Sequence, residues 1–174
     1  MVKTLRSVFL WLLFCPAVFA QCSVNQGLKR TQNIVQNLCN LGEMRPVRCK
    51  TEAENMKIQS PNVPKQEERL LVLEMSFRNL AVLLMNASTE WKSSELQQLQ
   101  EFLRHQTQCY TACILTASSA DAEVRNWNEF WSKLDRYLSE KSFSSCAWES
   151  ARTVIIRVMR QFIKFTKKSS NAIC

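Results

Sequence analysis

The sequence is poor in the two residues that most often interrupt helices. It contains two glycines and four prolines, and beyond the first twenty residues its prolines fall only between positions 46 and 64. Residues 65–174 contain neither glycine nor proline. Because these residues disfavour helix interiors and mark turns, their absence over this stretch predicts helices joined by short polar connections.

Long apolar runs are lacking everywhere except at the N-terminus. Lys3 and Arg6 precede an apolar run over residues 8–19, which ends in Val18-Phe19-Ala20. This is the pattern of a secretory signal peptide, and the run is too short to span a bilayer. We expect cleavage after Ala20, which leaves one domain over residues 21–174. The mature protein is then predicted to be soluble and secreted.

Histidine is nearly absent, and His105 is the single example. One histidine excludes most histidine-dependent catalysis, and no nucleophile–base set, paired carboxylates or glycine-rich phosphate loop can be picked out. Cys109 and Cys113 have the spacing of half a metal site, but a disulfide role fits a secreted chain better. We therefore predict a protein that is not an enzyme and uses no cofactor or metal, with His105 at the surface.

Acidic residues are outnumbered, with 15 Asp and Glu against 23 Lys and Arg, for a formal net charge of +8. A basic secreted protein can meet acidic receptor surfaces, glycosaminoglycans or anionic membranes. The charge excess alone selects none of these partners.

Apolar residues recur at three- and four-residue steps in five segments, as on the buried face of a helix. The first helix ends before Gly42, the second begins at Glu67 and the third near Ser94. The second segment is apolar on more than one side, through Leu71, Val72, Val82 and Met85, as expected of a central helix. The recurring positions are Leu28, Val35 and Leu38; Leu70, Leu73, Phe77, Leu80 and Leu84; Leu96, Leu99, Leu103, Tyr110 and Cys113; Val124, Trp127, Trp131, Leu134 and Leu138; and Ala151, Val154 or Ile155, Val158, Phe162 and Phe165.

Connection lengths predict the directions of these helices. Short connections make the second to fifth helices alternate in direction. The first and second helices are separated by residues 41–66, which is long enough to return along the bundle, so these two helices can run parallel. The predicted fold is an all-α bundle of five helices with an up-up-down-down core and a long first crossover.

These directions divide the cysteines left after processing into two groups at opposite ends of the bundle. Because disulfide geometry requires Cα atoms within about 7 Å, bridges form within a group. Cys22–Cys109 and Cys49–Cys146 are the expected bridges, Cys113–Cys174 fits as a third, and Cys39 remains as the odd thiol, expected to be buried. The two groups are Cys22, Cys109, Cys113 and Cys174, and Cys39, Cys49 and Cys146.

The segment Cys146-Ala-Trp-Glu-Ser-Ala-Arg152 resembles the Cys-Ala-Trp-Glu-x-x-Arg signature of type I interferons, which also opens the last helix in that family. The resemblance extends over the mature chain through an N-terminal cysteine, a cysteine in the long first loop and a cysteine late in the third helix. Members of the family link these cysteines as Cys22–Cys109 and Cys49–Cys146. The high cysteine count is more similar to the fish branch of the family than to the mammalian branch.

The resemblance implies a secreted antiviral cytokine with a four-helix-bundle fold. Such a protein bridges two different class II cytokine receptor chains, whose associated kinases then signal inside the cell. We therefore expect a heterodimeric receptor as partner, no nucleic acid, no membrane insertion, and a monomer.

The resemblance also implies which residues bind one receptor chain, since the family uses the exposed face of the last helix together with the long loop. The loop arginine of the family falls on Ala53 here, and Lys50 or Arg48 could take its place. Arginines suit such a surface because their planar fork matches carboxylates. The expected contact residues are Arg152, Thr153, Ile156, Arg157, Arg160 and Lys50.

Other interpretations of the basic last helix remain open at this point. Its stripe, which continues through Lys164, Lys167 and Lys168, can be a solvated face. It can also belong to a cationic membrane-active protein, although the apolar side of the helix is needed for the core. Another four-helix cytokine is a third interpretation.

Two further features have structural interpretations. Trp148 and the pair Trp127 and Trp131 are expected in the core. Asn86-Ala-Ser88 is an N-glycosylation sequon, expected at the end of the second helix where a glycan would be exposed.

Overall fold

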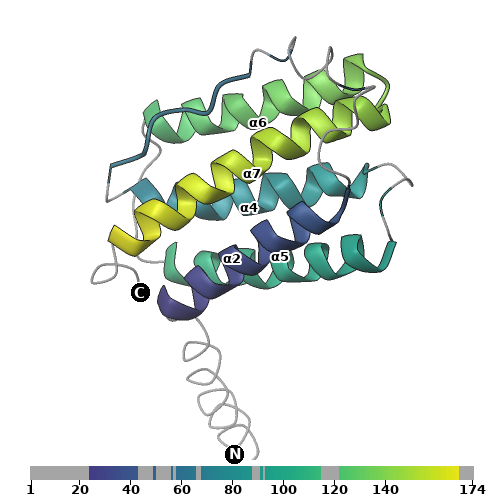
Figure 1. Ribbon diagram of the computed structural model, residues 1–174. Coiled ribbons are helices and arrows are strands. Elements are labelled where there is room, and N and C mark those ends of the chain that lie inside the picture. The colour runs from purple at the N-terminus through teal and green to yellow at the C-terminus, as the bar shows by residue number, and fades with distance from the viewer. Residues whose placement is uncertain are drawn as a thin grey trace, which may run out of the picture.

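The computed structural model describes residues 24–42, 49, 56, 58–65, 68–87, 91, 93–114 and 122–168. This part of the chain contains five helices and no strand (Figure 1). The helices are α2 (Val24–Asn40), α4 (Arg69–Met85), α5 (Ser93–Ile114), α6 (Ala122–Glu140) and α7 (Ser145–Lys168). The all-α prediction is therefore confirmed.

The five helices form a closed ring in which each packs against two neighbours. Around the ring the order is α2, α5, α4, α6 and α7, and α7 packs back against α2. In Figure 1, α2, α4 and α6 run in one direction and α5 and α7 in the other. The parallel arrangement of α2 and α4 agrees with the prediction from the long crossover between them, and it places the end of α2 beside the start of α7.

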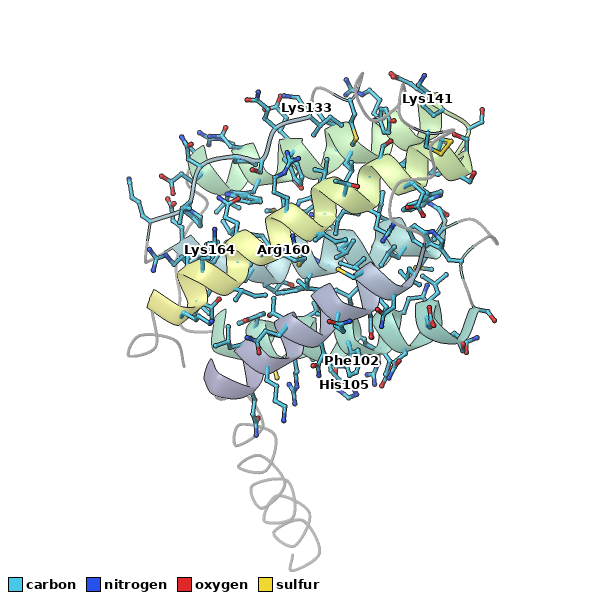
Figure 2. The ribbon with its side chains drawn as sticks, in the orientation of Figure 1. Phe102, His105, Lys133, Lys141, Arg160 and Lys164 are labelled. Carbon is cyan, nitrogen blue, oxygen red and sulfur yellow. A yellow bond between two sulfur atoms is a disulfide. The ribbon has the colours of Figure 1, made fainter. Side chains whose placement is uncertain are left out.

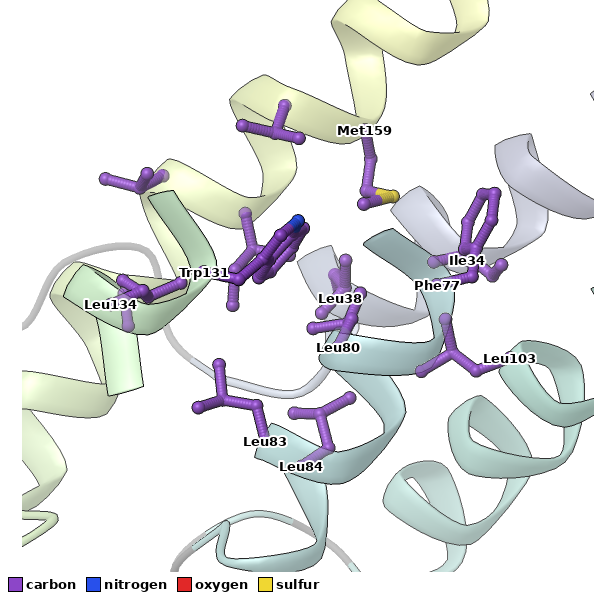
Figure 3. Packing of buried hydrophobic residues seen from close by; sticks show 14 of the residues in the cluster. Ile34, Leu38, Phe77, Leu80, Leu83, Leu84, Leu103, Trp131, Leu134 and Met159 are labelled. Carbon is purple, nitrogen blue, oxygen red and sulfur yellow. The ribbon is translucent and has the colours of Figure 1, made fainter. Parts of the chain in front are cut away.

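All five helices contribute side chains to one core, part of which is shown in Figure 3. Phe77 of α4 is fully buried in it, stacked on Tyr110 at 5.7 Å and in edge contact with Phe162 at 6.1 Å between ring centroids. Trp127, Trp131 and Trp148 are all buried, as predicted. The apolar side of α7 is buried as well, through Ala151, Val154, Ile155, Val158, Phe162 and Phe165.

The buried side of α2 differs from the predicted one. Leu28 and Val35 are only half-buried, whereas Thr31, Ile34 and Leu38 are buried. Small residues let α2 approach α5 closely, since a Cβ atom at Gly27 would lie 3.2 Å from the Tyr110 hydroxyl oxygen. The spacing of large apolar residues does not reveal this side of α2, because its contact with α5 is built partly from glycine and threonine.

The C-terminal end of α4 also departs from the expectation of a helix buried on several sides. Val72 is buried as expected, but Val82 is 58% exposed and Met85 is 76% exposed. The ring explains this difference, because among the described helices α4 packs mainly against α5 and α6.

The expected signal peptide, residues 1–20, lies outside the described residues. None of the helices in the described ranges is long and apolar enough to cross a membrane.

Candidate functional site

A disulfide joins the long crossover to the start of α7. Cys49 and Cys146 are bonded, with their Cα atoms 4.9 Å apart across a sequence separation of 97 residues. This is the pair expected from the sequence. The bridge places the crossover beside the first turn of the helix that carries the basic stripe.

The remaining cysteines are described only in part. Cys109 is also disulfide-bonded, which argues against the half metal site, but its expected partner Cys22 lies outside the described residues. The side chains of Cys113 and Cys174 are outside them too, so the third bridge remains an expectation. Cys39 carries a free thiol, as predicted, but it is half-buried rather than fully buried.

The turn between α6 and α7 fixes where α7 begins. Ser142 and Phe143 both have positive φ angles, 51° and 52°, and the Phe143 amide donates to the carbonyl oxygen of Leu138 at 2.8 Å. The hydroxyl of Ser144 then accepts a hydrogen bond from the Ala147 amide, which caps the first turn of α7. Phe143 packs against Trp148, so the turn and the helix start form one unit.

Glu149 and Arg152 form a buried ion pair one turn further along α7. Glu149 is 8% exposed and Arg152 is 4% exposed. The indole NH of Trp91, which comes from the connection between α4 and α5, donates to one Glu149 oxygen at 3.1 Å. Arg152 donates to the other oxygen through Nε, at 3.0 Å, and through Nη2. Both acceptor oxygens of the carboxylate are therefore engaged.

Arg152 also closes the end of α2. Its Nη1 donates to the carbonyl oxygens of Leu38 at 3.0 Å and Cys39 at 3.4 Å. Carbonyls in the last turn of a helix lack partners within the helix, so a guanidinium group satisfies them well. The side chain thereby connects α2, α7 and, through Glu149, Trp91.

The prediction that Arg152 lies on the exposed face of the last helix is wrong. A charged residue on the last helix is expected at the surface. Here, however, a carboxylate and two helix-end carbonyls accept hydrogen bonds from Arg152 inside the protein. The sequence held one indication, because Glu149 precedes Arg152 by three residues and this spacing brings side chains together on a helix. Trp91 had no such indication, since it stands alone in a short connection.

The other predicted residues of α7 do come together, along a groove of about 710 Å³. Thr153 and Ile156 are half-buried, whereas Arg157 and Arg160 are exposed. The crossover forms one wall, where the Gln161 amide donates to the carbonyl oxygen of Pro61 at 3.4 Å. We call this feature the α7 groove; its lining residues are Cys39, Ser60, Arg152, Thr153, Ile156, Arg157, Arg160, Gln161 and Lys164.

The α7 groove has a uniform charge. Four of its lining residues are lysine or arginine and none is acidic; Glu149 neutralises Arg152, so Arg157, Arg160 and Lys164 supply the free charge. Arg160 and Lys164 project from the C-terminal half of α7 (Figure 2). The arrangement can accept carboxylates or other anionic groups beside the apolar surface of Ile156.

Several residues singled out in the sequence lie away from the α7 groove or outside the described ranges. Lys50, Arg48 and Ala53 are not among the described residues. Asn86 is exposed directly after α4, as the glycosylation hypothesis requires, and His105 is at the surface as predicted. Cys39, Ser60 and Gln161, which the sequence did not indicate, line the groove.

Comparison with known proteins identifies the family. A family model described as an interferon alpha/beta domain matches residues 24–169. The chain belongs to the interferon alpha/beta family. It is an interferon-like cytokine and, like the other members of this family, not an enzyme.

Relatives of this interferon agree with that assignment at low identity. It is 23% identical to human interferon kappa, with 90% of this chain and 92% of that protein covered. It is 25% identical to interferon alpha-1 of Sus scrofa, with 87% and 89% covered. These matches confirm the prediction of a type I interferon.

Solved structures show that the interferon fold is shared. Zebrafish interferon 2 matches with a TM-score of 0.68 and 19% identity over 79% of this chain and 97% of that chain. Zebrafish interferon 1 matches with a TM-score of 0.56 and 15% identity over 83% and 94%. The predicted helical cytokine fold is thereby confirmed.

Proposed function

We propose that this interferon is a secreted antiviral cytokine whose α7 groove docks one chain of a heterodimeric class II cytokine receptor. A second receptor chain binds elsewhere on the bundle, and the two chains are brought together to start kinase signalling. The protein acts as a monomer and does no chemistry itself. Family membership supports class II cytokine receptors as the partners.

The observation that carries this proposal is the groove on the outer side of α7. It places Thr153, Ile156, Arg157 and Arg160 on one surface with cationic and apolar character and no acidic lining residue. Exposed arginines around a partly apolar centre are typical of binding hot spots. A receptor surface that presents carboxylates would be complementary to it.

The disulfide and the buried ion pair support the same proposal by making the groove rigid. Cys49–Cys146 attaches the crossover to α7, and Arg152 attaches the end of α2 to α7. A surface that is already ordered loses less conformational entropy on binding. Arg152 thus acts as a positioning residue, because its buried side chain holds the helices together and is not exposed to the receptor.

The membrane-active alternative loses support from the packing of α7. Such a helix must insert its apolar side into the lipid boundary. Here Val158, Phe162 and Phe165 are buried between the helices, so insertion would require the bundle to open.

A cell-reporter assay on responsive cells tests the proposed docking site. Arg157→Glu and Arg160→Glu, together, should lower potency by at least about a hundredfold, because each replaces an attraction with a repulsion at the interface. Arg125→Glu with Arg136→Glu, at exposed positions of α6, makes the same change in net charge and should leave potency within about threefold. A folded double variant with full potency would show that the groove does not dock the receptor.

A further inference from the structure

Most of the net charge of this protein is carried by two adjacent helices. The sequences of α2 and α7 contain eight lysines and arginines and one acidic residue, a net charge of +7, whereas the whole chain has a net charge of +8. The acidic residue is Glu149, which is buried and already paired with Arg152. The two helices pack against each other, so these charges belong to neighbouring elements of the bundle.

Within α7, four exposed cations follow one another at steps of three, four and three residues. We call Arg157, Arg160, Lys164 and Lys167 the α7 cationic stripe. This spacing keeps the side chains on one face over about 15 Å of helix. The stripe begins in the α7 groove and continues past it toward the C-terminal end of α7.

Within the described ranges, the stripe lacks the carboxylate partners that several cations on other helices have. Arg78, Arg104 and Lys133 each form an ion pair with a glutamate three or four residues earlier on the same helix. Among the residues that the structure describes, no carboxylate pairs with any member of the stripe. Its charges remain available to a partner, and together they produce a strong local positive potential.

Three kinds of polyanion could use such a potential, and the surroundings of the stripe distinguish them. A membrane requires exposed apolar residues and a single nucleic-acid strand requires exposed aromatic rings, but Trp148, Phe162 and Phe165 of α7 are buried. A nucleic-acid duplex presents phosphates on two strands, whereas the stripe is a single row of four cations on one helix. A single polysaccharide chain with repeated sulfate groups can enter the groove and follow the stripe.

We propose that the α7 cationic stripe binds sulfated polysaccharides of the cell surface and extracellular matrix. The inference rests on the secretion that is part of the proposed function, because secretion exposes the stripe to these polymers. Sulfates engage the guanidinium and ammonium groups as charge-assisted hydrogen bonds. Such binding retains the cytokine near the cells that release it.

The test uses purified protein and no receptor, so its outcome is independent of whether the α7 groove docks one. Dissociation constants for heparin are measured at 150 mM NaCl for the wild type and for Lys164→Gln with Lys167→Gln. This variant should bind about tenfold more weakly, since two exposed charge pairs are lost. Arg125→Gln with Arg136→Gln on α6 removes the same charge from exposed positions and should change the dissociation constant less than about twofold.

Two further arms distinguish the polyanions. A duplex DNA and vesicles that contain phosphatidylserine should each bind at least about tenfold more weakly than heparin at the same salt concentration. Thermal unfolding confirms that both double variants remain folded. Equal losses in the two variants, or duplex or vesicle binding as tight as that of heparin, would overturn the proposal.

Discussion

The guanidinium group of Arg152 is buried, so its hydrogen-bond donors depend on acceptors of the protein and not on water. Glu149 neutralises its charge, and the carbonyl oxygens of Leu38 and Cys39 accept further hydrogen bonds. Removing one partner of a buried ion pair leaves the other charge without compensation, which is usually more costly than the pair is stabilising.

Arg152→Ala should therefore lower the free energy of unfolding by about 3–5 kcal/mol. Urea denaturation followed by circular dichroism measures this change. Arg157→Ala, five residues later on the exposed side of α7, serves as the control and should cost less than about 0.5 kcal/mol. Nearly equal stabilities of the two variants would mean that the ion pair does not hold α2 and α7 together.

Gly42 is required for the same ion pair for a steric reason. A Cβ atom at this position would overlap Oε1 of Glu149 and lie 3.1 Å from its Cδ. Glu149 cannot simply move away, because Trp91 and Arg152 hold its carboxylate from two sides.

We expect Gly42→Ala to lower the free energy of unfolding by about 1–3 kcal/mol, the usual cost of overpacking a filled site. The exposed Ser94→Ala, on α5, provides a control for the effect of an added or removed small group. In a Glu149→Ala background the steric conflict is gone, so Gly42→Ala should then be nearly neutral. A full penalty that persists in that background would contradict the steric explanation.

At the scale of elements, the contact between α2 and α5 contains a buried tyrosine. Burial raises the pKa of Tyr110 to about 12, although hydrogen bonds with Gln106 and Thr31 and the charge of Arg30 act in the opposite direction. The neutral hydroxyl is therefore favoured in the folded protein. Unfolded tyrosine ionises with a pKa of about 10.

The sign of the pH dependence follows from these two values. Below pH 10 both states keep the proton, and the contribution to stability is complete. Between about pH 10 and pH 12 only the unfolded state ionises, so stability falls as pH rises, by about 1.4 kcal/mol at pH 11. Urea denaturation at pH 8 and pH 11 should show this extra loss in the wild type and not in Tyr110→Phe. Equal losses in both proteins would contradict it.

The presence of five helices could be predicted from the sequence because large apolar residues repeat on their buried sides. The directions followed from connection lengths, and the Cys49–Cys146 bridge followed from the directions. The predictions were wrong where burial depends on residues that are small, polar or charged. Thr31 and Gly27 form the seam of α2, and Arg152 is buried because acceptors from two helices meet there.

The candidate site was therefore predicted in part. Thr153, Ile156, Arg157 and Arg160 lie together because they fall within about two consecutive turns of one helix, which fix their relative positions. Ser60 and Cys39 enter the groove only through tertiary packing of the crossover and α2 against α7. No local pattern in the sequence could place those two residues beside α7.

At the scale of the whole molecule, the most exposed large apolar side chains lie near the C-terminal end of α4. Among the described residues, the large apolar side chains that are most exposed are Met85, at 76%, and Val82, at 58%. Neither residue lines the α7 groove. Both lie within four residues of Asn86, the exposed first position of the glycosylation sequon.

We expect Asn86 to carry an N-linked glycan that shields Val82 and Met85 from other molecules. Protein secreted from eukaryotic cells should lose the mass of one glycan on treatment with a peptide N-glycosidase, and Asn86→Gln should show no such change. Without the glycan, the two exposed side chains form an apolar patch that favours association. Light scattering at increasing concentration should therefore reveal more self-association in Asn86→Gln than in the wild type.

The matched control for this prediction is Ser88→Ala, which removes the sequon and keeps Asn86. It should associate as Asn86→Gln does, because both lack the glycan. Adding Val82→Gln and Met85→Gln to either variant should restore the monomer, since the apolar patch is then removed. A glycan-free protein that remains monomeric at every concentration would show that the glycan has no shielding role, and an unchanged mass after enzymatic treatment would show that Asn86 is not modified.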